Sequence, residues 1–240
     1  MTDENNTQIV NLSKLNSSST SKFGGKASNL GELINSGINV PEGFAINTDL
    51  YFDFLNKSNL KEKITNLIQN SNSLKINELQ KLSNQIKELF NKTQFDTDII
   101  STIEKEYKRI GSSRVAVRSS ATSEDSMEAS FAGQQNTYLN IIGFNSLIES
   151  IKACWASVFE ARAIFYRNSQ NIAHFDSGMS VVIQQMIQPD VSGVMFTLEP
   201  TTLDPDKIVI EAAFGLGEAV VSGIVTPDYY VIEKSTQTVV

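Results

Sequence analysis

The stretch from residue 114 to residue 142 restricts the possible folds of this chain more than any other. It reads RVAVRSSATSEDSMEASFAGQQNTYLNII. Alternating apolar residues, Val115 and Val117, open the stretch, and a second β-type run over residues 137–142 closes it. The segment between them is rich in hydroxyl groups and contains one glycine, Gly133. This pattern predicts a strand, a polar loop, a glycine and a second strand, an order that can present hydrogen-bond donors to an anion.

Arg118 lies where the first of these strands is expected to end. Its planar guanidinium group can bind a phosphate through two parallel hydrogen bonds, each contributing about 1.5–3 kcal/mol. The alternative is a solvated acidic loop in which Thr122 and Asp125 form a capping box, and composition alone favours it. The nearby Glu124 and Glu128 would also repel a bare triphosphate unless a metal ion or further cations intervene.

A second candidate lies in residues 23–37, FGGKASNLGELINSG. Apolar spacing predicts a helix that ends at Gly37 and carries Lys26 in its first turn. The helix dipole disfavours a cation at that position, and a local conflict of this kind indicates a functional role. Gly24 and Gly25 allow the backbone to approach an anion at the helix N-terminus. A solvated surface lysine is the alternative interpretation of Lys26.

Both stretches resemble one protein family. VRSSATSED followed by ASFAGQQNTYLNI resembles the ATP-binding domain of phosphoenolpyruvate synthases and rifampicin phosphotransferases, with pyruvate, phosphate dikinase as a more distant relative. GGKASNLGEL followed by VPEGFAI resembles the N-terminal signature of the same family. One departure is that Ser126 and Met127 replace the usual Leu-Pro pair. The resemblance extends from Phe23 to the end of the sequence.

The resemblance implies an α/β (α+β) fold with an ATP-grasp-like architecture of two lobes. Residues 1–178 are expected to form the first lobe, and residues 179–240 part of the second lobe, whose C-terminal part we expect to be missing. Apolar residues at helical spacing predict that residues 58–110 form a helical segment of the first lobe. Within residues 1–22, the apolar residues between Ile9 and Leu15 favour a strand.

The segment MSVVIQQMIQPDVSGVMFTLEP predicts an antiparallel hairpin that turns at residues 189–190. A buried glutamine within its first strand needs a hydrogen-bonding partner, which an adenine ring could supply; exposure on an edge strand is the alternative. The segment resembles the family's adenine hinge strand, which indicates Gln184, Gln185 and Met186 as cofactor-binding positions. Which of the two glutamines faces adenine is left open. Glu211 is a candidate ribose or cation partner, and an ordinary salt bridge is its alternative.

The resemblance also assigns roles in chemistry. It implies that Lys26 and Arg118 bind ATP phosphates and act in catalysis, and that Gly133 and Thr137 bind the nucleotide. In the related enzymes ATP phosphorylates a histidine on a swivelling domain, which passes the phosphoryl group to pyruvate or rifampicin. The only histidine, His174, does not lie in that domain's motif, so we reject it as the phosphocarrier. The resemblance places the Mg²⁺ ligands beyond residue 240, and no metal ligand is expected within this chain.

We therefore expect the ATP-binding portion of a dikinase-type phosphotransferase that is inactive as an isolated chain. Phosphoenolpyruvate synthase is favoured as the commoner housekeeping activity, and rifampicin phosphotransferase is the alternative. A non-catalytic nucleotide-binding or regulatory protein is the alternative from another class. Reading the gene downstream of codon 240 would separate the enzyme from this last alternative.

Composition excludes several other classes. The net charge of −7 argues against sequence-independent nucleic-acid binding. The single cysteine, Cys154, excludes an internal disulfide, and we expect it in the core beside Trp155. The first ten residues do not resemble a signal peptide, and no apolar run is long enough to cross a bilayer. These features predict a cytoplasmic protein without membrane or nucleic-acid partners.

Overall fold

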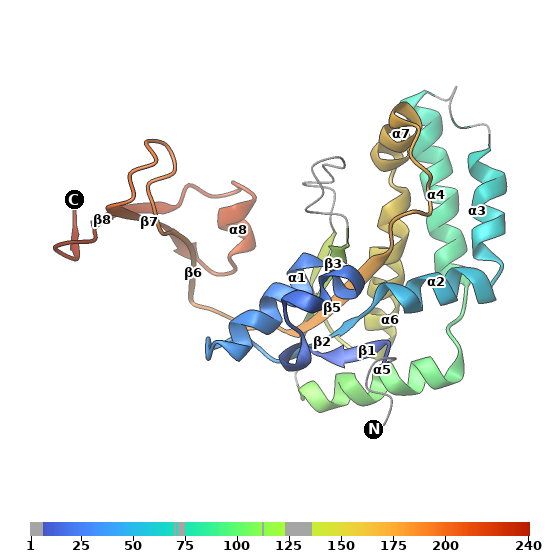
Figure 1. Cartoon of the computed structure of the whole chain (residues 1–240), viewed down its shortest axis with the longest axis horizontal. Helices are drawn as coiled ribbons and strands as arrows, with labels where there is room; N and C mark the ends of the chain where they lie inside the picture. The colour runs from blue at the N-terminus through green and yellow to red at the C-terminus, as the bar shows by residue number, and fades with distance from the viewer. Residues whose placement is uncertain (1–6, 70, 72–74, 112, 123–135) are drawn as a thin grey trace. The chain divides into compact units, whose positions relative to one another are not determined.

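The computed structural model describes residues 7–69, 71, 75–111, 113–122 and 136–240 (Figure 1). Helices and strands both occur throughout, which agrees with the predicted mixed α/β class. The chain divides into two compact units, Met1–Met186 and Ile187–Val240. Each unit has its own sheet.

The first unit is built around a five-stranded antiparallel sheet with the strand order β1-β2-β5-β3-β4. The strands are β1 (Ile9–Asn11), β2 (Gly43–Ile46), β3 (Val115–Ala121), β4 (Thr137–Ile141) and β5 (Met179–Gln185). β5 lies in the centre, and its first six residues are buried. The apolar run of residues 181–183 suits this place, because helices cover the sheet on both faces.

One face of this sheet packs against a layer of helices and forms the larger core. The helices are α2 (Thr48–Lys57), α3 (Leu60–Ile68), α4 (Ile76–Lys92), α5 (Thr97–Ile110), α6 (Phe144–Ala156) and α7 (Ala161–Gln170), with the 3₁₀ turn η5 (Ser157–Phe159) between the last two. The helices predicted for residues 58–110 are confirmed as α3, α4 and α5. Cys154 and Trp155 are fully buried, as predicted.

The opposite face is covered by α1 (Thr20–Asn35) and the short 3₁₀ turns η2 (Leu12–Lys14) and η3 (Ser17–Ser19). A smaller core forms there, in which Ala27 of α1 and Val182 of β5 are both fully buried. The predicted C-terminal cap of the helix is confirmed, because Gly37 has a φ of 77° and its N–H bonds to the carbonyl of Ile34.

The strand expected between Ile9 and Leu15 is shorter than predicted. Only residues 9–11 pair with β2, and Leu12–Lys14 form a 3₁₀ turn that Asn11 caps by accepting the N–H of Ser13 at 2.9 Å. The turn buries Leu12 in the smaller core.

The predicted hairpin at residues 189–190 is wrong. β5 pairs with β2 and β3, whereas β6 (Val191–Phe196) pairs with β7 of the second unit. Val181 and Ile183 lie on one face of β5 and Val182 on the other, all fully buried, so the strand gains most from a central position between two covered faces. The units divide after Met186, so β5, the strand that we expect to contact adenine, belongs to the first unit. The lobe boundary after residue 178 stays a prediction. The assignment of these units to lobes stays a prediction.

The second unit holds a four-stranded sheet with the order β6-β7-β8-β9. Its further elements are β7 (Lys207–Phe214), α8 (Glu218–Val221), β8 (Asp228–Glu233) and β9 (Thr238–Val239). α8 contacts β6 and β7. Within residues 187–240, which the structure describes completely, Val209 and Val220 are the only apolar side chains that are buried.

Candidate functional site

The helix that carries Lys26 is interrupted by a glycine. Gly24 has φ 74° and ψ 168°, so the regular part of α1 starts after it, and Lys26 lies in the first turn of that part, as predicted. A Cβ atom on Gly24 would lie 2.5 Å from the Ser120 Oγ and 2.7 Å from the carbonyl oxygen of Ala121. Only glycine tolerates both the backbone conformation and this close approach. The start of the helix therefore lies directly against the end of β3.

Arg118 lies on the sheet face that α1 covers. It is directly opposite Val182 on β5 and Thr137 on β4, and opposite residues of neighbouring strands point to the same face. Val182 packs with Ala27 of α1 on that face. The Arg118 side chain is half-buried, and its guanidinium group has no hydrogen bond or ion pair with any residue that the structure describes.

The structure thus brings together three of the predicted nucleotide-binding positions. The turn that carries Lys26, the strand position of Arg118 and the exposed Thr137 all belong to one face of the first sheet. Lys26 is half-buried. Gly133, the fourth predicted position, lies outside the described residues.

The two glutamines of β5 lie on opposite faces of the sheet. Gln184 is opposite Ala116 of β3 and Gly43 of β2, so its side chain is on the face of Arg118. It is only 8% exposed, and its Nε2 donates to the Pro41 carbonyl at 3.1 Å. Gln185 is half-buried on the face of the helical layer. Because β5 is a central strand, exposure on an edge strand is excluded for both.

Met186 and Glu211 are the remaining predicted positions. Met186 follows β5, and its Sδ accepts the backbone N–H of Asn140 at 3.4 Å. Glu211 is half-buried in β7, opposite Val194 and Tyr229, and belongs to the second unit.

His174 takes part in a network of hydrogen bonds. Arg167, which is 3% exposed, donates from Nε to the His174 Nδ1 at 3.2 Å, and the His174 Nε2 lies 2.9 Å from the Asn168 Oδ1. Burial and the neighbouring Arg167 charge lower the pKa of His174 to about 4. The ring is therefore neutral near pH 7, with its proton on Nε2. This arrangement ties α7 to the segment that leads to β5.

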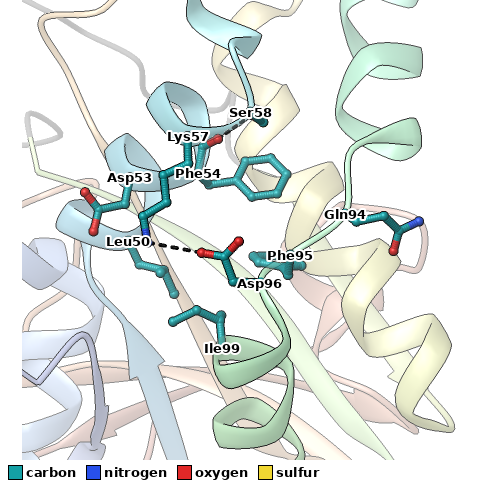
Figure 2. A pocket seen from close by; sticks show the side chains of 9 residues that line it. All are labelled: Leu50, Asp53, Phe54, Lys57, Ser58, Gln94, Phe95, Asp96 and Ile99. Carbon is teal, nitrogen blue, oxygen red and sulfur yellow. Dashed lines mark hydrogen bonds and ion pairs between the residues drawn. The ribbon is translucent and has the colours of Figure 1, made fainter.

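A small pocket of the first unit is lined by none of these residues (Figure 2). It has a volume of about 110 Å³ and lies between α2 and the segment before α5, where Lys57 and Asp96 form an ion pair of 3.1 Å. Pockets that hold drug-sized ligands measure about 300–1,000 Å³. This pocket is therefore too small for a nucleotide.

The part of the chain that the structure describes has neither a clustered metal site nor a membrane-spanning helix. No three His, Cys, Asp or Glu side chains are grouped there closely enough to hold a metal ion. No helix in the described ranges is both long and apolar enough to cross a membrane.

Comparison with known proteins identifies the family. Residues 20–240 match the model described as pyruvate phosphate dikinase, AMP/ATP-binding domain. The chain belongs to this family. The matched range includes Lys26, Arg118, Thr137 and Gln184, so the face described above lies within the AMP/ATP-binding domain.

Three similar proteins are named as phosphoenolpyruvate synthases or probable phosphoenolpyruvate synthases. A probable phosphoenolpyruvate synthase of Staphylothermus marinus is 45% identical over 97% of this chain, which is 29% of that relative. A probable phosphoenolpyruvate synthase of Methanothermobacter thermautotrophicus is 46% identical over 89% of this chain and 32% of its own length. The phosphoenolpyruvate synthase of Aquifex aeolicus is 41% identical over 89% of this chain and 26% of its own length. The chain spans less than a third of each relative.

Sequence reasoning did not single out Ser120, which joins the strand of Arg118 to the helix of Lys26. Ser120 lies two residues after Arg118 on the same strand and accepts the Ala27 N–H of α1 at 3.4 Å. Alternation along a strand places residues two apart on one face, so its position beside Arg118 could have been predicted. Its contact with α1 could not.

Proposed function

We propose that this chain binds ATP in a phosphoenolpyruvate synthase, with Lys26 and Arg118 holding the phosphates. The observation that carries the proposal is that the helix turn of Lys26 and the strand position of Arg118 lie on one sheet face of a dikinase-family AMP/ATP-binding domain. A cationic first turn and a half-buried guanidinium group together suit an anion such as a triphosphate. An ATP-grasp-like closure of two lobes around the nucleotide is part of this proposal.

The proposed reaction converts ATP, pyruvate and water into phosphoenolpyruvate, AMP and phosphate through a phosphohistidine on another domain. Lys26 and Arg118 would neutralise charge on the phosphates and hold them in line for transfer, because positioning and electrostatics supply most of the catalysis in phosphoryl transfer. Thr137 and Gly133 would add hydrogen bonds. Mg²⁺, when bound, would neutralise further charge on the phosphates, and we expect its ligands beyond residue 240.

Gln184 is the better candidate than Gln185 for the contact with adenine. It shares the sheet face of Arg118, whereas Gln185 lies on the face of the helical layer. Its amide already bonds to the Pro41 carbonyl, which orients it. Met186 and Glu211 remain proposed partners of the base and of the ribose or a cation.

Arginine variants test the proposal in the full-length protein. Arg118→Ala should lower turnover with pyruvate by about 100-fold or more, because a charged donor to the transferring group is lost. Arg118→Lys should recover little, since an ammonium group cannot form two parallel hydrogen bonds. Arg162→Ala is the control, because Arg162 is exposed on α7. Near-normal turnover of Arg118→Lys would contradict the bidentate role, and phosphorylation of rifampicin in place of pyruvate would contradict the choice of acceptor.

The isolated chain should bind ATP weakly and transfer no phosphoryl group. Incubation with radiolabelled ATP and Mg²⁺ should leave no protein-bound label, because the phosphocarrier histidine is expected on another domain. Acid-labile, base-stable label that disappears in His174→Ala would show that His174 carries the phosphoryl group. Submicromolar ATP affinity, about −8 kcal/mol or stronger, would show a more complete site than we propose.

A further inference from the structure

The start of the regular part of α1 lacks a capping side chain of its own. The first N–H groups of a helix have no partner within the helix, and a side chain at the N-cap position usually accepts the N–H two or three residues later. Gly24 occupies that position and has no side chain to do this. The close approach to β3 excludes any larger residue there. The acceptor must therefore come from elsewhere in the fold.

Ser120 of β3, on the sheet face that α1 covers, supplies the missing acceptor for the first turn of the helix. Its Oγ accepts the N–H of Ala27 at 3.4 Å, between residues 93 positions apart in the sequence. Ala27 is three residues after Gly24, which is the N–H that a local cap would bind. Ser120 and Ala27 are both fully buried, so water cannot replace this hydrogen bond. Ser120, a residue of β3, thus takes the role of the N-cap acceptor for the regular part of α1.

We propose that Ser120 is a positioning residue for nucleotide binding, in addition to the binding residues of the proposed function on which this inference rests. It holds the turn from Gly24 to Ala27 against β3 and so sets where Lys26 stands relative to Arg118. The same strand carries Arg118 two residues earlier, on the same face. One rigid strand therefore fixes both cationic positions, one directly and one through the first turn of α1.

Ser180 provides a matched control. It lies directly opposite Ser120 on β5, on the same face, and both residues are 0% exposed. Its Oγ has no hydrogen-bond partner among the described residues. Ser→Ala at either position removes the same atom from the same buried layer, but only at Ser120 does the change remove a bond to α1.

The experiment compares Ser120→Ala with Ser180→Ala in the full-length protein. Amide hydrogen exchange without nucleotide should be faster for residues 25–28 in Ser120→Ala and unchanged in Ser180→Ala. Calorimetry should show ATP binding about 3- to 30-fold weaker in Ser120→Ala, which corresponds to the usual cost of losing an N-cap, and unchanged binding in Ser180→Ala. Ser120→Cys keeps a side-chain acceptor at this position, although a larger and weaker one, and should lie between wild type and Ser120→Ala.

A double-mutant cycle separates positioning from a general structural role. If Ser120 acts through Lys26, the effect of Ser120→Ala on the ATP dissociation constant should shrink in a Lys26→Met background. Full additivity, or equal effects of Ser120→Ala and Ser180→Ala, would overturn the inference. Should Ser120→Ala fail to fold, Ser120→Cys takes its place in the comparison with Ser180→Ala, and the same outcomes support or overturn the inference. Absence of ATP binding by the wild type would instead overturn the proposed function, while the exchange result would still test the cap.

Discussion

The two sheets of this protein differ in how far they bury their own side chains. In the first unit six of the seven residues of β5 are buried, whereas no residue of β6 in the second unit is buried. Phe44 of β2 is 0% exposed and Phe214 of β7 is 86% exposed. Both sheets are antiparallel and both consist largely of apolar strand residues. Strand pairing alone therefore does not bury the side chains of a sheet. A hydrophobic core forms only where helices or other elements cover its faces.

The second sheet carries apolar residues on a face that its own elements leave open. The register places Val191, Met195, Ile210, Phe214 and Tyr230 on one face. α8 begins on the other face, where Gly217 lies beside Ser192. Four of the five apolar residues are more than 40% exposed. The first unit should thus be stable by itself, whereas the second has little buried surface to offset its conformational entropy.

The largest expected difference between the two units is in cooperative unfolding, once each is expressed as a separate fragment. A fragment of residues 1–186 should retain helical circular dichroism and unfold cooperatively on heating. A fragment of residues 187–240 should show no cooperative transition, because Val209 and Val220 are the only buried apolar side chains within it. Cooperative unfolding of the smaller fragment would show that its sheet is stable without further cover.

A pair of phenylalanine substitutions, one in each unit, should differ clearly in how much they lower the free energy of unfolding. Phe90→Ala in α4 should lower the free energy of unfolding by about 3–5 kcal/mol, since Phe90 is fully buried and packs on Phe54 and Phe159. Phe214→Ala should change it by no more than about 0.5 kcal/mol, because the side chain is already exposed. Denaturant titrations measure both. A large effect of Phe214→Ala would mean that this face is covered in solution.

The smallest expected difference between the two units is in how their stability depends on pH. The pKa of His174 falls from an ordinary 6.5 to about 4, so its contribution to stability is complete above pH 6.5 and is lost as the pH falls towards 4. In the second unit, hydrogen bonds from Thr202 and Thr201 lower the pKa of Glu199 from 4.5 to about 2, so its contribution is lost only between those values. The first unit should therefore lose stability at milder acidity.

Two variants separate these contributions. Between pH 7 and pH 5 the melting temperature of His174→Gln should fall less than that of the wild type. Glu199→Gln should follow the wild-type slope over that range and diverge from it only below pH 4.5. A wild-type slope in His174→Gln would show that the histidine is not held neutral in the folded state.

Local patterns in the sequence predicted much of the first unit and of its site. Apolar spacing predicted α4 and α5, a glycine after the last turn marked the end of α1, and the two signatures led to the family and to Lys26 and Arg118. These features depend on residues within a few positions of each other, where side-chain periodicity, capping and backbone preference act directly.

The tertiary structure alone decided which distant segments meet. β5 pairs with β2 and β3 and not with the strand that follows it, and Ser120 caps a helix 93 residues away. The same register assigned Gln184 and not Gln185 to the face of Arg118. Alternation along a strand says which residues share a face but not which strand lies beside it. The choice of neighbour depends on how much apolar surface both faces can bury in the complete fold, and that quantity is not local to any segment.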